Sequence, residues 1–306
     1  MSADPVPDLL VLGAGPAGVS AALWAESFGL SAVVLEQRDG PGGQLLHVHF
    51  EPLNFAGGVA GDGREIATRL GHQLERSSAR VHYGVGVYGI DPAVPSVRDA
   101  AGARWSARAA LIATGVRRRV LEVPGEHELE GHGVSFSATQ DRERFAGDDV
   151  AVVGGGDAAF ENALLLAEVG CHVTLLVRAR PRARAEFRER VAGEPRIEVL
   201  ENTRVLAVNG EERVTGLRLA SERGDFELPV SAVVIKIGVV PNSEWCAGRL
   251  DRDAEGYVLV DEHFGTSQPR VWAIGDVTRP PVASVAVALG QATLAVAAIH
   301  TVLREP

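Results

Sequence analysis

Two short apolar runs open the chain and are joined by a glycine-rich turn. Leu9–Leu12 and Ala32–Leu35 contain only apolar residues, which is typical of strands buried on both faces of a parallel sheet. Between them, Gly13, Gly15 and Gly18 have the spacing G-x-G-x-x-G, and a stretch rich in alanine follows. The pattern predicts a strand, a tight turn, a helix with small residues facing the sheet, and a second strand.

This first unit has the residues of a dinucleotide site. Glycines permit the tight turn and let the backbone approach a pyrophosphate, which lies at the helix N-terminus. Glu36 directly follows the second run, 18 residues after Gly18, close to the place where a carboxylate accepts hydrogen bonds from ribose hydroxyls. An acid at this position suits the adenosine ribose of FAD.

The same pattern recurs in the middle of the chain with a different ending. Gly154, Gly156 and Ala159 give G-x-G-x-x-A between the apolar run "VAVV" and a helical stretch. No acid follows the second strand; four arginines follow Val177 instead, namely Arg178, Arg180, Arg182 and Arg184. Arginine binds a 2′-phosphate, which an acid would repel. This unit predicts NADPH in preference to NADH, with a solvated basic turn as the alternative.

A third apolar run lies near the C-terminus. The stretch "VWAIGD" ends in Gly275 and Asp276, and an alanine-rich helix is expected from about Ser284. An aspartate at the end of a strand can hold a ribityl hydroxyl, and a helix N-terminus can face the electron-rich pyrimidine edge of a flavin. The two nucleotide units and this segment together indicate one FAD and one NADPH.

Length, composition and charge narrow the class of protein. The chain has 306 residues, 46% of them hydrophobic and 23% charged, which suits two globular domains. A net charge of −10 argues against nucleic acid as a partner. No apolar run is expected to cross a membrane, and the N-terminus lacks the basic region of a signal peptide, so a cytoplasmic protein is expected. Cys171 and Cys246 have no metal-type spacing, and Cys171 is expected in the core.

The chain resembles the low-molecular-weight thioredoxin reductase family of bacteria over essentially its full length. The matching pieces are "GAGPAG", "GGQL", "LNFAGG", "IATG", "GVSFSATQD", "VVGGGDAA", "GVVPN" and "VWAIGD". The resemblance implies an α/β fold of two Rossmann-like nucleotide-binding domains, one inserted in the other. It places an FAD-binding domain at 1–116 and 239–306, an NAD(P)H-binding domain at 117–238, a hinge between them, and a homodimer.

The resemblance also assigns cofactor contacts position by position. For FAD it gives Gly13, Gly15, Gly18, Glu36, Gly42, Gly43, Gln44, Asn54, Gly275, Asp276, Val277, Ser284 and Val285. For NADPH it gives Gly154, Gly156, Asp157, Ala159, Arg178, Arg182 and Arg184. The family's phosphate clamp, His-Arg-Arg-x-x-x-Arg, is only partly present, because Ala179 stands at its second arginine.

Two departures from the family bear on the reaction. The family's Gly-Val-Ser-Tyr-Cys-Ala-Thr-Cys-Asp reads "GVSFSATQD" here, so Ser137 and Gln140 stand at the positions of the redox cysteines. Neither side chain can exchange disulfides, which argues against dithiol relay to thioredoxin. At the flavin edge the family's Arg-Gln-Ala reads Ala283-Ser284-Val285, and the loss of a cation there is expected to destabilise reduced flavin.

An NADPH-to-flavin oxidoreductase with a non-disulfide acceptor is the favoured hypothesis. Ser137, Gln140 and Asp141 would line the acceptor site, and the resemblance gives Asp141 a part in proton transfer; the alternative is a polar loop end with Asp141 as a helix cap. The alternation of His47, His49 and Glu51 predicts one side of an extended strand near the flavin.

Two other functions remain open from the sequence. Ferredoxin–NADP reductase activity would need a local basic face, for which Arg117–Arg119 and Arg178–Arg190 are candidates. A non-catalytic FAD- and NADPH-binding sensor or scaffold would use the hinge as a two-state element. The sequence does not name the electron acceptor.

Overall fold

The computed structural model describes residues 5–48, 51–52, 55–56, 61–91 and 95–305. The chain divides into two compact units. The discontinuous unit comprises Met1–Arg117 and Val240–Pro306, and the inserted unit comprises Arg118–Val239. These divisions fall one residue after the boundaries expected from the sequence.

A parallel five-stranded sheet forms the centre of the discontinuous unit. Its order is β18 (Val271–Ala273), β7 (Ala109–Ile112), β1 (Leu9–Leu12), β2 (Ala32–Leu35) and β3 (Arg80–His82). The first and second strands have the bounds expected from their apolar runs, and all residues of both are buried. A strand that is apolar on both faces requires cover on both, and in this unit the two sides of the sheet form separate hydrophobic clusters.

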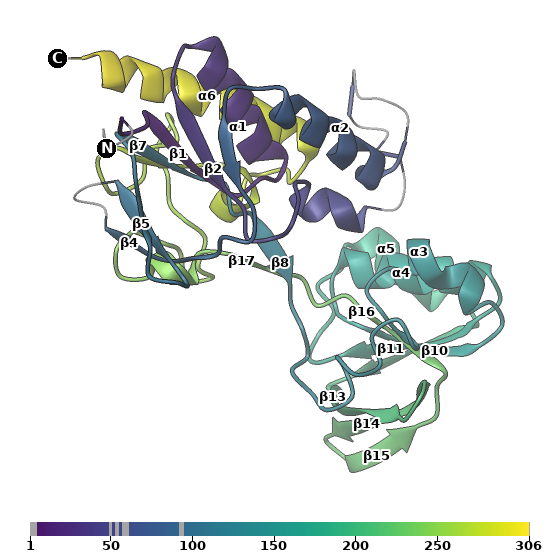
Figure 1. Cartoon of the computed structure of the whole chain (residues 1–306). Coiled ribbons are helices and arrows are strands. Elements are labelled where there is room, and N and C mark those ends of the chain that lie inside the picture. The colour runs from purple at the N-terminus through teal and green to yellow at the C-terminus, as the bar shows by residue number, and fades with distance from the viewer. Residues whose placement is uncertain (1–4, 49–50, 53–54, 57–60, 92–94, 306) are drawn as a thin grey trace. The chain divides into compact units, whose positions relative to one another are not determined.

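Helices α1 (Pro16–Ser27) and α6 (Val285–Arg304) pack against each other and lie side by side in Figure 1. Their contact is built largely from alanine, so the two helix backbones can approach closely. Ala17, Ala21 and Ala25 of the first helix and Ala288 and Ala292 of the second belong to one buried cluster. Helix α2 (Gly63–Glu75) packs beside α1 and begins with a capping box between Asp62 and Glu65.

A small antiparallel sheet completes the discontinuous unit. It contains β4 (Val87–Asp91), β5 (Ser96–Asp99) and β6 (Arg104–Ser106), and β4 contacts the short helix η3 (Glu244–Cys246). Two further short helices are η1 (Gly43–His47) and η4 (Gly275–Thr278), and β8 (Val116–Arg118) pairs with β17 (Val239–Pro241).

The inserted unit has a second parallel sheet. Its order is β12 (Ile197–Glu201), β11 (His172–Val177), β10 (Asp149–Val153), β16 (Ala232–Ile235) and β9 (Val134–Ser135). Its helices are α3 (Ala138–Asp141), η2 (Arg142–Arg144), α4 (Asp157–Glu168) and α5 (Ala185–Ala192). A three-stranded antiparallel sheet also belongs to it, made of β13 (Arg204–Gly210), β14 (Val214–Ser221) and β15 (Gly224–Leu228).

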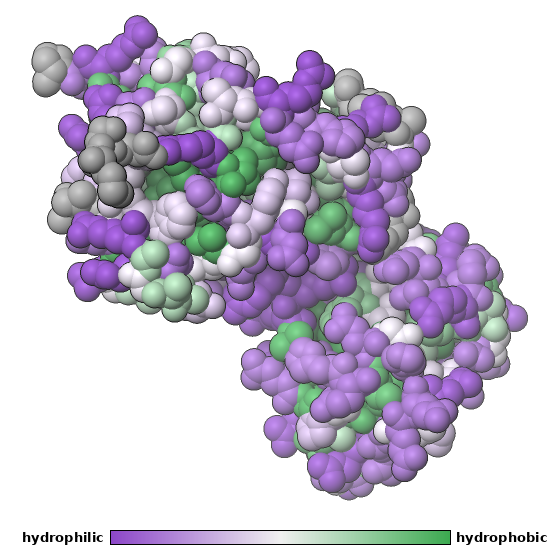
Figure 2. All heavy atoms as spheres, viewed as in Figure 1, coloured by the Kyte–Doolittle hydropathy of each residue, from purple (hydrophilic) through white to green (hydrophobic). Residues whose placement is uncertain are grey.

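Strand β10 shows how this unit is layered. Val150 and Val152 belong to a cluster with residues of α4, whereas Ala151 and Val153 belong to a cluster with residues of β14. Successive side chains of a strand point to opposite faces, so the apolar run covers two cores at once. Figure 1 shows α3, α4 and α5 on one side of the sheet and β13, β14 and β15 on the other. Hydrophilic residues cover most of the visible face of each unit (Figure 2).

One sequence expectation is wrong, and another holds only in part. By length and composition α6 would pass as a membrane span, although no run of that length was expected; since one face of it packs on α1 in the core, it is no clear evidence of a span. The expected extended strand at His47 is instead the end of η1. Gly42 and Gly43 have φ values of 128° and 54°, which turn the chain into this helix and bury Leu45. His49 lies outside the described residues.

Candidate functional site

The discontinuous unit contains a cavity of about 1010 Å³. Both chain segments of the unit line it, with residues from the turns that follow β1, β2, β7 and β18 and from the start of α6. The carboxyl ends of parallel strands are where open α/β sheets bind their ligands. Nine residues assigned to FAD lie within the described part of its lining: Gly13, Gly15, Glu36, Gly43, Gln44, Gly275, Asp276, Ser284 and Val285.

The glycines of the first turn are required by close backbone approaches. Gly13 has φ 105°, and a Cβ atom there would lie 2.5 Å from the carbonyl oxygen of Ala113. A Cβ atom on Gly18 would lie 1.8 Å from the carbonyl oxygen of Gly13, so Gly18 brings α1 against the turn and does not itself line the cavity. Gly15 and Gly43 face each other, since a Cβ atom on Gly43 would lie 3.1 Å from the Cα atom of Gly15.

Glu36 is fixed at the edge of this cavity by two backbone groups. Its Oε2 accepts a hydrogen bond from the Ala14 N–H at 2.6 Å, and its Oε1 accepts one from the Arg38 N–H at 2.9 Å. The residue is 8% exposed. A carboxylate has about four acceptor positions, so about two remain for a ligand such as a ribose diol.

Asp276 lines the same cavity, but its carboxyl group lacks the backbone hydrogen bonds that hold Glu36 among the described residues. Burial raises the pKa of its carboxyl group above the ordinary value. No described residue donates a hydrogen bond to that carboxyl group, although the neighbouring Gly275 N–H donates to Gln291 Oε1 at 2.7 Å. A half-buried carboxyl group in the cavity lining, with no donor among the described residues, fits a ligand that brings a hydroxyl group, as the ribityl chain of FAD would.

A polar cluster in the lining was absent from the sequence-based assignment. The Thr114 hydroxyl donates to the Asn242 carbonyl oxygen at 2.7 Å, and Asn242 Nδ2 donates to the Thr114 carbonyl oxygen at 2.8 Å. Arg117 donates to Asn242 Oδ1 and forms an ion pair with Glu244. These bonds join the two segments of the unit. The signal was present in the motifs "IATG" and "GVVPN", which contain Thr114 and Asn242.

Other assigned residues have structural partners or lie elsewhere. Gln44 lines the cavity, but its Nε2 donates to the Val116 carbonyl oxygen at 2.7 Å. The Ser284 hydroxyl caps α6 by accepting from the Val287 N–H at 3.2 Å. Gly42 and Val277 are not part of the lining, and Asn54 lies outside the described residues.

The inserted unit repeats the turn around Gly154. This residue has φ 149°, and a Cβ atom on it would lie 2.2 Å from the Lys236 carbonyl oxygen and 2.9 Å from the Cβ of Ala159. Gly156 is the N-cap of α4 and has open space at its Cβ position. The turn therefore leaves the first backbone N–H groups of an α-helix facing outward, as a pyrophosphate site requires.

The arginines beside this turn differ in their partners. Arg184 donates to Asp157 twice, from its backbone N–H at 2.8 Å and from its Nε at 2.7 Å. The pKa of Asp157 lies below its ordinary value, mainly because its carboxylate accepts the hydrogen bond from the backbone N–H of Arg184. The guanidinium groups of Arg178 and Arg182 are exposed and have no hydrogen-bond or ion-pair partner among the described residues. No pattern in the sequence predicted that Asp157 and Arg184 would pair with each other.

The stretch of the inserted unit that carries Ser137 is held by Ser135 and Asp141. The Ser135 hydroxyl donates to Asp141 Oδ2 at 2.6 Å, and Arg144 donates to Asp141 Oδ1 at 3.2 Å. Ser137 is the N-cap of α3 without a side-chain cap bond, and Gln140 is exposed. Asp141 ends α3 and stands at the N-cap position of η2, where its side chain makes no cap hydrogen bond. The buried Ser135 was not singled out from the sequence.

Both cysteines are free and buried. Cys171 lies in the core of the inserted unit, as expected, and Cys246 lies in η3 of the discontinuous unit. Burial raises the pKa of the Cys171 thiol and raises that of Cys246 to about 11. A thiol must ionise before it can attack a disulfide, so both groups are poor nucleophiles near neutral pH.

Comparisons with known proteins agree with this architecture. A family model for pyridine nucleotide-disulphide oxidoreductases matches residues 7–292. The chain is 37% identical over 289 residues to a bifunctional thioredoxin reductase/thioredoxin of Mycobacterium leprae, covering 90% of this chain and 61% of that protein. It is 35% identical over 278 residues to a thioredoxin reductase of Streptomyces coelicolor, covering 89% of this chain and 86% of that protein. The chain spans less than two thirds of the length of several curated relatives that it matches.

A solved structure gives the same result for the fold. The thioredoxin reductase of Lactococcus lactis in its FR conformation has a TM-score of 0.77 and 26% identity, and the match covers 96% of this chain and 98% of that chain. The likeness confirms the α/β fold with two Rossmann-like domains that the sequence predicted. The chain therefore belongs to the pyridine nucleotide-disulphide oxidoreductase family.

Proposed function

We propose that this protein is an FAD-dependent NADPH oxidoreductase whose acceptor is not a disulfide. The observation that carries the proposal is the place of the sulfur atoms: both cysteines are buried, and they belong to different units. The positions that match the family's redox cysteines hold Ser137 and Gln140, which cannot exchange disulfides. The two glycine turns are nevertheless intact, so both nucleotide sites are expected to work.

FAD would occupy the cavity of the discontinuous unit. Glu36 would accept hydrogen bonds from the adenosine ribose, the turn at Gly13 and Gly15 would face the pyrophosphate, and Asp276 would accept from a ribityl hydroxyl. The volume of about 1010 Å³ is at the upper end of ligand pockets and suits a dinucleotide. When bound, a flavin supplies the ability to take a hydride from a nicotinamide and to pass electrons to an acceptor.

NADPH would bind at the turn of the inserted unit. The N-terminus of α4 would hold the pyrophosphate, and the exposed Arg178 and Arg182 would bind the 2′-phosphate. Arg184 would act differently, because its pairing with Asp157 orders the loop that carries the other arginines.

Ser137, Gln140 and Asp141 would face the acceptor. The exposed amide of Gln140 can orient a polar acceptor by hydrogen bonding. The hydrogen bonds from Ser135 and Arg144 keep the side chain of Asp141 oriented at the end of α3.

An anaerobic titration of the FAD-loaded protein with NADPH and then with NADH tests the electron donor. We expect NADPH to bleach the flavin absorbance at lower concentration than NADH. The variant Arg178→Gln should weaken the response to NADPH about tenfold, because it removes one charge-assisted contact, and leave NADH unchanged. Arg188→Gln, an exposed arginine of α5, is the matched control. Bleaching by neither nucleotide would exclude an NADPH oxidoreductase.

A second assay tests the exclusion of disulfides. The protein is reduced by NADPH. It is then offered three acceptors in parallel, namely a small protein with an oxidised disulfide, a quinone and ferricyanide. We expect turnover with a non-disulfide acceptor only, and we expect Cys171→Ala combined with Cys246→Ala to retain it. NADPH-dependent reduction of the protein disulfide that is lost in the double cysteine variant would refute the proposal.

A further inference from the structure

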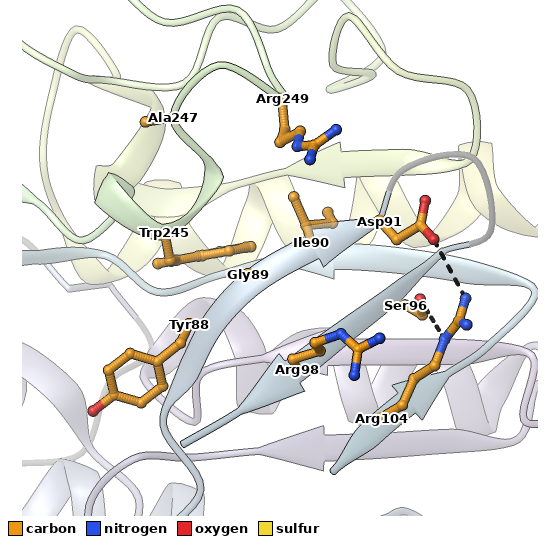
Figure 3. Close-up of a pocket in the computed structure, with 10 residues that line it drawn as sticks. All are labelled: Tyr88, Gly89, Ile90, Asp91, Ser96, Arg98, Arg104, Trp245, Ala247 and Arg249. Atoms are coloured by element: carbon orange, nitrogen blue, oxygen red, sulfur yellow. Dashed lines mark hydrogen bonds and ion pairs between the residues drawn. The ribbon is translucent and has the colours of Figure 1, made fainter. Parts of the chain in front are cut away.

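A second cleft lies within the discontinuous unit, beside the large cavity. Its volume is about 520 Å³, and its lining comes from the sheet β4–β6 and from the segment that contains η3 (Figure 3). Tyr88 and Trp245 line both this cleft and the large cavity. The cleft therefore adjoins the proposed FAD site without being part of it, and neither dinucleotide motif contributes to it.

Three arginines converge on this cleft. Arg98 of β5 and Arg104 of β6 are directly opposite each other in the antiparallel register, and Arg249 follows η3 in the other chain segment. Like charges in directly opposed positions destabilise a strand pair. An arrangement that brings a third positive charge to the same cleft is costly for the free protein, and an anionic ligand would remove that cost.

Among the residues that the structure describes, one of the three arginines has a hydrogen-bond or ion-pair partner. Arg104 forms a 3.5 Å ion pair with Asp91, and its Nε donates to the Ser96 hydroxyl at 3.0 Å. Within the part of the chain that the structure describes, neither Arg98 nor Arg249 has a hydrogen-bond or ion-pair partner. The cleft thus has three positive charges against one negative charge, in a chain whose net charge is −10.

The shape of the cleft leaves room beside these charges. Gly89 pairs with Arg98 across the sheet, and a Cβ atom on Gly89 would meet nothing within 4 Å. Tyr88 lies at a register shift of β4, where a bulge redirects a side chain. Figure 3 shows Trp245 and Tyr88 at one end of the cleft and Arg98, Arg104 and Arg249 toward the other.

We propose that this cleft binds a small phosphate ester that carries a planar ring. The guanidinium groups of Arg98 and Arg249 would bind phosphate oxygens through paired N–H donors, and Arg104 would add a third charge. The ring would lie against the indole of Trp245, which offers apolar surface at the opposite end of the cleft. The site shares Tyr88 and Trp245 with the proposed FAD cavity, whereas its three arginines line neither that cavity nor the turn at Gly154.

Calorimetric titration of the full-length, FAD-loaded protein with phenyl phosphate tests the proposal. This probe has the ring and the phosphate but no adenosine, so it does not imitate the ligands of the two dinucleotide motifs. We expect saturable binding at one site. Arg98→Gln and Arg249→Gln should each weaken it about tenfold, because each removes charge-assisted hydrogen bonds. The matched control is Arg69→Gln, an exposed arginine of α2 outside the cleft, which should leave binding unchanged.

Two further measurements separate the parts of the proposal. Inorganic phosphate should bind more weakly than phenyl phosphate, and equal affinity would overturn the contact with the ring. Gly89→Val should abolish binding by filling the open space, with circular dichroism and FAD content unchanged as evidence of folding. No saturable binding to the wild-type protein at millimolar probe, or the same affinity in Arg98→Gln combined with Arg249→Gln, would overturn the site itself.

Discussion

Two carboxyl groups line the large cavity of the discontinuous unit, and their surroundings differ. Glu36 accepts two backbone hydrogen bonds, whereas no described residue donates to the carboxyl group of Asp276. The first carboxylate therefore supports the local fold with or without a ligand, because it satisfies the N–H groups of Ala14 and Arg38. The carboxyl group of Asp276 is half-buried, and no described residue donates a hydrogen bond to it; a ligand that brings a donor would stabilise its charged form. The two residues should respond in opposite ways to substitution.

Glu36→Ala should lower both stability and FAD affinity. The change leaves two N–H donors without their acceptor, at a cost of about 1–3 kcal/mol for the buried N–H group of Ala14 and less for that of the exposed Arg38. Glu36→Gln keeps one oxygen acceptor and should cost less. The measurements are the urea midpoint and the dissociation constant for FAD, with Glu75→Ala, an exposed acid of α2, as control. An unchanged urea midpoint in Glu36→Ala would contradict the structural part of this role.

Asp276→Asn should stabilise the FAD-free protein at pH 7. Burial raises the pKa of this carboxyl group in the folded state, so its protonation favours folding. That stabilisation is complete below the unfolded pKa, about 3.9, and is lost as the pH rises through the folded pKa. The neutral amide escapes the loss, and its advantage in Tm should therefore shrink between pH 7 and pH 4. Asp39→Asn, an exposed acid, should show no such trend.

At the scale of elements, each glycine turn packs against the helix that follows it, but the residue at the third position of the motif differs between the two units. In the discontinuous unit the third position of the motif is Gly18, whose Cβ position is filled by a carbonyl oxygen at 1.8 Å. In the inserted unit the same position is Ala159, which is fully buried. Helix α1 thus lies closer to its turn than α4 does.

Gly18→Ala should destabilise the discontinuous unit by about 2 kcal/mol or more, because α1 must move away from the turn or strain the backbone. The reverse change in the other unit, Ala159→Gly, should cost only about 1 kcal/mol, from the lower helix propensity of glycine and a lost methyl group. Urea unfolding followed by circular dichroism compares them. FAD retention should fall in the first variant only. Equal losses would show that the two turns are packed alike.

Local patterns predicted the elements well and the contacts between distant residues poorly. The runs Leu9–Leu12 and Ala32–Leu35 became strands with those bounds, and Ser284 was placed at the start of α6, because apolar continuity and capping act within a few residues. The pairing of Asp157 with Arg184 links residues 27 apart, and no local pattern encodes it. The expected strand at His47 failed because two glycines in left-handed conformations outweighed a period-two alternation.

At the scale of the whole molecule, each unit has its own core. The two buried clusters of the inserted unit contain only residues between 121 and 237. The discontinuous unit instead joins two segments: β18 pairs with β7, and Asn242 bonds to Thr114 and Arg117. One unit is therefore continuous in sequence and complete in its packing, and the other needs both ends of the chain.

A fragment of residues 118–239 should consequently fold alone and keep the NADPH site. We expect one cooperative thermal transition, since its sheet, helices and both clusters are internal to the fragment. NADP⁺ at about a hundredfold excess over its Kd should add about 2.7 kcal/mol of stability and raise the Tm, whereas FAD should not. A fragment of residues 1–117 is the matched control, and it should not fold cooperatively, because it lacks β18 and α6. A non-cooperative inserted fragment, or one whose Tm responds to FAD, would contradict this division of the molecule.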